Sequence, residues 1–78
     1  MSDANADPTA LTVAQALAQA RNCGVDRLDA HLLLGHVLGR SRTWLLSHDT
    51  DLLDPEAQAR YLALLARRAE GEPAAYLL

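Results

Sequence analysis

The hydrophobic residues of this chain recur every three or four positions over most of its length. No segment alternates apolar and polar residues as a half-buried strand would. Helical spacing gathers apolar side chains on one face, where they can pack against another helix. The pattern predicts four helices and a terminal helical turn, at about residues 13–23, 27–38, 42–48, 55–70 and 73–78.

Residues suited to starting and stopping helices stand at the ends of these segments. Thr12 and Gln15 have the spacing of a capping box, in which each side chain accepts a hydrogen bond from a free backbone N–H. Asp26 and Ser41 are expected N-caps of the next two helices. Asp54 precedes a proline at the first helical position, where a missing N–H removes no helical bond. The glycines expected to end helices are Gly24, Gly39 and Gly71.

The segment 27–38 carries the widest apolar stripe and is expected to be the most buried helix, with Leu28 and Leu32 widening that stripe. Gly35 in its middle costs about 1 kcal/mol relative to alanine, unless a neighbouring segment packs closely over it. One buried cluster is predicted to contain Leu33, Leu34, Val37, Leu45, Leu64 and Leu65.

The composition also favours helices. Half of the 78 residues are apolar, which separates the chain from disordered sequences and limits it to one small domain. Alanine and leucine dominate that half, whereas phenylalanine and isoleucine are absent, and this bias favours helix over sheet. We therefore expect an all-α fold, a small bundle of about five helices.

The net charge, the cysteine count and the N-terminal sequence restrict the binding partners and the cellular compartment that can be expected. A net charge of −3 disfavours a generic binder of nucleic acid or anionic membrane. The single cysteine, Cys23, cannot form an internal disulfide. Residues 1–10 are polar and lack the apolar run of a signal peptide, so they are expected to be a disordered tail before a helical domain over 11–78. No apolar stretch approaches the ~20 residues of a membrane span, and the protein is expected to be cytoplasmic.

The histidines, the cysteine and the carboxylates lack the spacing of a metal or catalytic site. His31 and His36 lie five positions apart, so a helix would point them ~140° apart; His31 is expected to be at the surface or half-buried. Cys23 and His48 fall in different connections and form no zinc-type ligand pair. No glycine-rich phosphate loop is present, and no nucleophile is paired with a base. The sequence predicts no metal, cofactor-binding or catalytic residue.

One arrangement suggests a binding function. The stretch "LLLGHVLGRSRTWLLSH" predicts two helices joined by a glycine turn, the second opening near Arg40 and Arg42, as in a helix-turn-helix. Trp44 and its leucine neighbours leave little polar surface on that short helix, and DNA readers carry a basic stripe that an acidic chain lacks. Nucleic-acid binding is therefore the weaker alternative to simple helix packing.

Two stretches together resemble the N-terminal domain of the HemK/PrmC family. The first is "RLDAHLLLGHVLGRSRTWLL"; its matching residues are Arg27, Asp29, Ala30, Leu33, Leu34, His36, Val37, Leu38, Gly39 and Arg42. The second is "LLARRAEGEPAAYLL", which is the more specific because a helical bundle does not demand Gly-Glu-Pro-x-x-Tyr. Its matching residues are Arg67, Arg68, Gly71, Glu72, Pro73, Tyr76 and Leu77. His31, where family members often carry an acid, and Gly35 depart from the pattern.

The resemblance implies a function for the chain and for a longer parent protein. Members of this family are protein-(glutamine-N5) methyltransferases that modify bacterial peptide chain release factors with S-adenosylmethionine. They continue into a Rossmann-like catalytic domain with a glycine-rich loop and an Asn-Pro-Pro-Tyr motif, and this chain contains neither. The resemblance thus implies a non-catalytic substrate-recognition domain whose catalytic domain is missing from this chain. Its implied partners are a release factor and that C-terminal catalytic domain. A free-standing helical interaction domain, or a DNA-binding helix-turn-helix, is the alternative.

Three arginines are candidate contacts for a partner, namely Arg42, Arg67 and Arg68. An arginine near a helix end can equally bind backbone carbonyls or a neighbouring acid. At the end of the sequence, Tyr76 is expected to pack on the bundle, whereas Leu78 is expected to be exposed.

Overall fold

Five helices form in the part of the chain that the computed structural model describes, residues 10–78, and no strand occurs in that part. In chain order they are α1 (Val13–Asn22), α2 (Arg27–Leu38), α3 (Arg42–Ser47), α4 (Pro55–Ala69) and α5 (Ala74–Leu77). The prediction of a small all-α bundle is confirmed, and the helix ends agree with it to within about two residues. The tail expected at residues 1–10 lies, except for Ala10, outside the described residues.

The capping residues act as the sequence predicts. The backbone N–H of Gln15 donates to Thr12 Oγ1 (3.1 Å), and the N–H of Thr12 donates to Gln15 Oε1 (2.9 Å), which completes the capping box at the start of α1. Asp54 Oδ2 accepts from the N–H of Glu56 (3.1 Å) at the start of α4. Gly39 ends α2 in the left-handed conformation (φ 66°), which a side chain rarely adopts.

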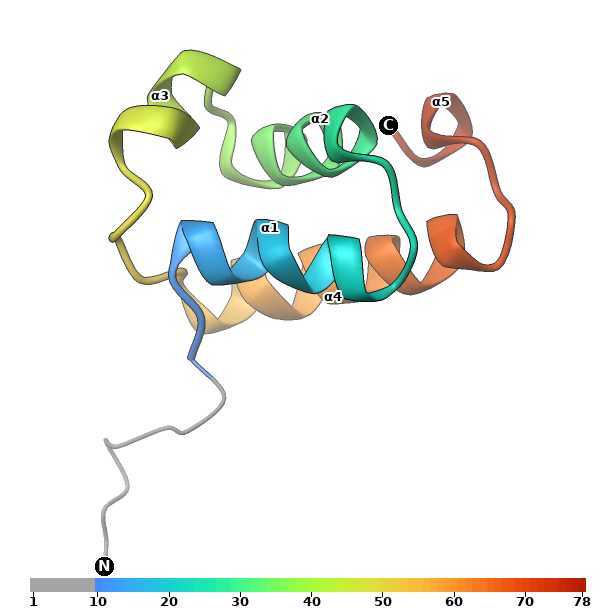
Figure 1. Ribbon diagram of the computed structural model, residues 1–78, viewed down its shortest axis with the longest axis horizontal. Coiled ribbons are helices and arrows are strands. Elements are labelled where there is room, and N and C mark those ends of the chain that lie inside the picture. The colour runs from blue at the N-terminus through green and yellow to red at the C-terminus, as the bar shows by residue number, and fades with distance from the viewer. Residues whose placement is uncertain (1–9) are drawn as a thin grey trace, which may run out of the picture.

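The helices are arranged in two layers around α2. In Figure 1, α1 and α4 run side by side beneath α2, while α3 and α5 lie near its two ends. Helix α2 contacts α1, α3, α4 and α5, so it is the element that all the others share. The segment after α3 returns to the start of α1: Leu53 N–H donates to Leu11 O (2.8 Å) and Val13 N–H donates to Asp51 O (2.9 Å).

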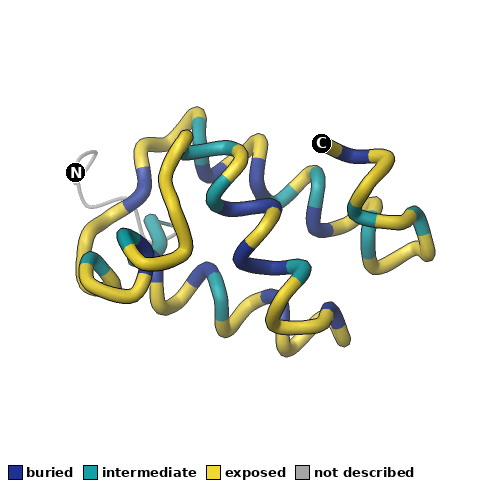
Figure 2. Tube along the Cα trace, turned by 90° about the horizontal axis from the view of Figure 1, so that it is seen from above, coloured by how far each residue is buried: buried dark blue, intermediate teal, exposed yellow. Residues whose placement is uncertain are grey.

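The core lies between α2 and the lower layer. Figure 2 shows buried positions recurring at intervals along the helices, between exposed ones. Tyr61 is fully buried, and its hydroxyl donates to Ala16 O (2.8 Å), which joins α4 to α1. Burial raises the pKa of the Tyr61 hydroxyl above its ordinary value, because the charged form would lose its hydration.

Most of the predicted buried cluster is confirmed. Leu33, Leu34, Leu45 and Leu65 are at most 1% exposed, whereas Val37 and Leu64 are half-buried and pack against them. The expectation for Leu28 and Leu32 was wrong, because they are 53% and 46% exposed. These two side chains stand one turn apart on the same side of α2, and the helices of residues 10–78 leave that side uncovered.

Gly35 is required by the turn that follows α2. A Cβ added to it would lie 2.8 Å from the carbonyl oxygen of Arg40, closer than such contacts occur. The chain folds back here because Arg40 N–H donates to Gly35 O (3.0 Å). Because it has no side chain, Gly35 allows the backbone of Arg40 to approach closely. This close packing explains why a residue of low helix propensity stands in the middle of α2.

Replacing Leu34 by alanine tests the core. The loss of buried side chain and the cavity should lower the free energy of unfolding by about 2–5 kcal/mol, measured by urea denaturation. Leu32→Ala removes the same atoms from the same helix at a site that is 46% exposed, and should cost under about 1 kcal/mol. Equal denaturation midpoints for the two variants would contradict the core assignment.

Gly35→Ala tests the turn. Helix propensity alone would stabilise this variant by about 1 kcal/mol, but the new methyl group would collide with the carbonyl of Arg40. We expect a lower melting temperature by circular dichroism. His36→Ala, at the exposed neighbouring position of the same helix, should leave the melting temperature unchanged or raise it. A stabilised Gly35→Ala variant would show that the turn does not need the glycine.

Candidate functional site

The three arginines predicted as partner contacts do not come together. Arg42 is exposed at the start of α3, whereas Arg67 and Arg68 are in the last turn of α4. These two places lie at opposite ends of the bundle (Figure 1). A single partner surface made of all three is therefore not supported by the arrangement of the helices.

Arg67 and Arg68 each hold a carboxylate of this chain. Arg67 makes a two-pronged contact with Glu72, with Nη2–Oε1 at 2.8 Å and Nε–Oε2 at 3.2 Å, across the turn at Gly71. This contact lowers the pKa of the Glu72 carboxyl, because the arginine hydrogen-bonds and attracts its charged form. Arg68 Nε donates to Asp29 Oδ2 (2.9 Å), and this pair joins the end of α4 to the first turn of α2. Partner contact through either arginine stays a prediction.

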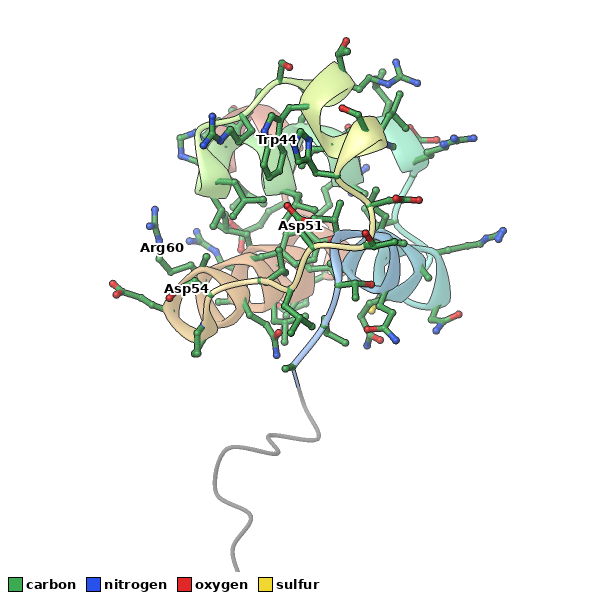
Figure 3. The ribbon with its side chains drawn as sticks, turned by 90° about the vertical axis from the view of Figure 1, so that its left-hand side faces the viewer. Trp44, Asp51, Asp54 and Arg60 are labelled. Atoms are coloured by element: carbon green, nitrogen blue, oxygen red, sulfur yellow. The ribbon has the colours of Figure 1, made fainter. Side chains whose placement is uncertain are left out.

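The helix proposed to read DNA is largely engaged with its own neighbours. The guanidinium of Arg40 lies 4.9 Å from the centroid of the Trp44 ring, and the His48 ring stacks on the same ring at 4.1 Å. In Figure 3, Trp44 lies on α3 above the loop that carries Asp51, while Arg60 projects from α4. Cation–π and stacking contacts of this kind hold Arg40 and His48 against Trp44, at the two ends of α3.

An open groove of about 440 Å³ lies where α1 and α3 flank α2. Its lining is mostly aliphatic, from α1, the turn after it, α2 and α3. Charged side chains border it: Arg21 and Arg27 beside the α1–α2 turn, and Asp49 after α3. The full lining consists of Ala14, Leu17, Ala18, Arg21, Val25, Arg27, Ala30, His31, Leu45, Leu46 and Asp49.

His31 is part of this lining and was predicted wrongly as a surface or half-buried residue. It is 4% exposed, because it lies among the inward residues of α2 with Ala30 and Leu34. Its Nδ1 is 2.8 Å from the carbonyl oxygen of Arg27. Since a carbonyl only accepts, Nδ1 carries a proton. Nε2 is buried and has no hydrogen-bond partner among the described residues.

Four more apolar side chains are exposed on α2 and at the C-terminal helix α5, and these two helices pack against each other. They are Leu28 and Leu32 of α2, Tyr76 of α5 and Leu78 after it, and together they are called the second apolar surface. The expectation that Tyr76 packs on the bundle was wrong, since it is 82% exposed, and Leu77 is the residue of α5 that turns inward, at 8%. Leu78 is 50% exposed, as expected.

Residues 10–78 contain neither a candidate metal site nor a candidate membrane span. No three histidine, cysteine, aspartate or glutamate side chains gather as a metal site would need. No helix in this part of the chain is long and apolar enough to span a membrane.

Comparison with known proteins identifies the family. Residues 9–78 match the sequence profile of the PrmC N-terminal domain. The chain therefore belongs to the PrmC N-terminal domain family, as the motifs around Gly39 and Gly71 indicated. No solved structure matches the chain significantly.

The relatives are long proteins that share only this region. The chain is 58% identical over 55 residues to a release factor glutamine methyltransferase of Bordetella pertussis, covering 70% of this chain and 20% of that protein. The protein of the same name from Burkholderia pseudomallei is 51% identical over 70 residues, covering 90% and 24%. That of Escherichia coli is 44% identical over 64 residues, covering 81% and 23%. The chain thus spans about a quarter or less of the curated relatives it matches.

A double-mutant cycle tests whether Arg68 stabilises the fold. Its side chain and that of Asp29 are 30% and 22% exposed, so their attraction is partly shielded from water. Combining Arg68→Ala with Asp29→Ala should reveal a coupling of about 0.5–1 kcal/mol that weakens at high salt. The matched cycle uses Arg67→Ala and Glu72→Ala, a more exposed pair, and should give a smaller coupling. Zero coupling for Arg68 and Asp29 would leave Arg68 free for a partner.

Proposed function

We propose that this chain is the substrate-recognition domain of a release factor glutamine methyltransferase. The observation that carries the proposal is the match over residues 9–78 to the PrmC N-terminal domain, in relatives named for that activity. On this proposal the methyl donor, S-adenosylmethionine, binds in a catalytic domain outside the chain. The chain itself is non-catalytic, and the parent enzyme works in the cytoplasm, where translation terminates.

A domain of this kind can raise the rate without touching the reacting atoms. An acceptor glutamine in a large protein must reach the methyl donor in one orientation, and contacts far from the reaction can supply that orientation. A compact bundle with its own core is suited to this task because it holds a surface rigidly. The groove along α1 and the exposed apolar residues of α2 and α5 are two such surfaces.

We assign the two surfaces different partners. The apolar surface with Leu28, Leu32, Tyr76 and Leu78 would face the catalytic domain of the same polypeptide. Its support is that these four side chains are apolar and 46–82% exposed within residues 10–78, and exposed apolar side chains in number often mark a contact with another domain or protein. The release factor then contacts another face of the bundle.

Kinetics with two substrates test the proposal. The parent enzyme is compared with a variant that lacks residues 10–78, using an intact release factor and a short peptide that contains the acceptor glutamine. We expect the deletion to lower kcat/KM for the intact factor at least about tenfold, equivalent to about 1.4 kcal/mol of transition-state binding. For the peptide, kcat/KM should change less than about twofold.

The control for folding is cofactor binding by the shortened enzyme, measured by calorimetry. With cofactor binding intact, an equal loss for both substrates would assign the domain to catalysis rather than recognition. Unchanged kcat/KM for the intact factor would refute the recognition role.

A further inference from the structure

We propose that the groove along α1, α2 and α3 is the docking site for an amphipathic helical segment of the release factor. The segment would insert apolar side chains between α1 and α3 and bring a carboxylate to Arg21 and Arg27. This inference rests on the proposed function and adds the surface, the kind of segment and its direction.

The dimensions of the groove suit a helix. Ala14 and Arg21, which mark its two ends on α1, are seven residues apart, or about 10 Å along the helix axis. Two helical turns of a partner therefore lie along it, with side chains one turn apart pointing inward. Aliphatic walls from α1 and α3, such as Ala18 and Leu46, match the apolar face that helix-in-groove complexes use.

The charges give the bound segment a direction. Arg21 and Arg27 lie at the end beside the α1–α2 turn, and Asp49 lies at the other end, where its carbonyl accepts from Ala14 N–H (2.9 Å). Within residues 10–78 none of these three side chains is in an ion pair, since the ion pairs there involve Arg67 and Arg68. A segment with an acid at one end and a base two turns away would complement both ends.

The buried polar atom in the lining fits the same occupant. His31 Nε2 is enclosed and has no hydrogen-bond partner within residues 10–78, and leaving a buried polar atom unpaired is unfavourable. Because the atom is enclosed in the free chain, a polar group of the segment would pair with it once the groove widens. Binding would then exchange an unfavourable free state for a hydrogen bond.

Other occupants fit the groove less well. Small-molecule sites enclose the ligand and present several converging polar groups, whereas this groove is open and carries its charges at the two ends. A symmetric dimer through the groove would place two concave surfaces face to face, and neither would fill the other.

Titration followed by amide NMR tests the proposal on the 78-residue chain, with an intact bacterial release factor as the probe. Signals of Ala18, Ala30 and Leu46 should shift or broaden. Ala18→Trp fills the groove from an exposed position of α1 and should weaken binding at least tenfold. Its matched control, Ala63→Trp, changes an exposed alanine of α4 outside the lining and should bind as the original chain does.

A charge reversal provides the second test. Arg21→Glu should weaken binding several-fold, whereas Arg60→Glu, which makes the same change on the exposed surface of α4, should not. All four variants are checked for the original melting temperature.

The outcomes separate the two proposals. If Ala18→Trp leaves binding intact, or if the NMR shifts are confined to α4 and α5, the groove is not the docking site. The proposed recognition function would be unaffected by that result. Absence of any binding to the release factor would overturn the groove as its docking site, while the two-substrate kinetics decide the recognition function. Concentration-dependent shifts of the same signals without the factor, with dimers in sedimentation, would assign the groove to self-association instead.

Discussion

The structure depends on the central position of α2. Among residues 10–78, α2 contacts all the other helices, namely α1, α3, α4 and α5. That position demands apolar residues on most of its circumference and small ones where backbones approach. Ala30 and Gly35 are the small residues at such places. At Gly35 the chain folds back so closely that the carbonyl oxygen of Arg40 lies where a side chain would begin.

Long-range polar contacts then fix the outer helices relative to one another. Tyr61 in the middle of α4 bonds to the backbone of α1, and Arg68 in the last turn of α4 bonds to Asp29 in α2. A third contact joins Leu11 N–H to the side-chain oxygen of Gln58 (2.8 Å), next to the backbone bonds of the loop after α3. Hydrogen bonds that are each worth about 1 kcal/mol add little to stability compared with the core, but they select one arrangement of the helices.

This arrangement also explains the two surfaces left over. Helices α1 and α3 both pack against α2. The space between them is the groove whose lining includes His31. Leu28 and Leu32 point away from the four neighbouring helices and stay exposed. A bundle of five short helices cannot cover its central helix completely, and the uncovered parts are the natural places for contact with other proteins or domains.

The sequence by itself determined the helices, their caps and the all-α class, because those features depend on interactions within a few residues. Thr12 with Gln15 and the glycine stop at Gly39 are examples. The family could also be recognised, since its motifs are local. Tertiary structure alone decided that His31 is buried and Tyr76 exposed, and that Arg68 binds Asp29 from 39 residues away. Periodicity shows which side chains share a face of a helix, but the burial of that face depends on where other helices lie, and those contacts join residues far apart in the chain.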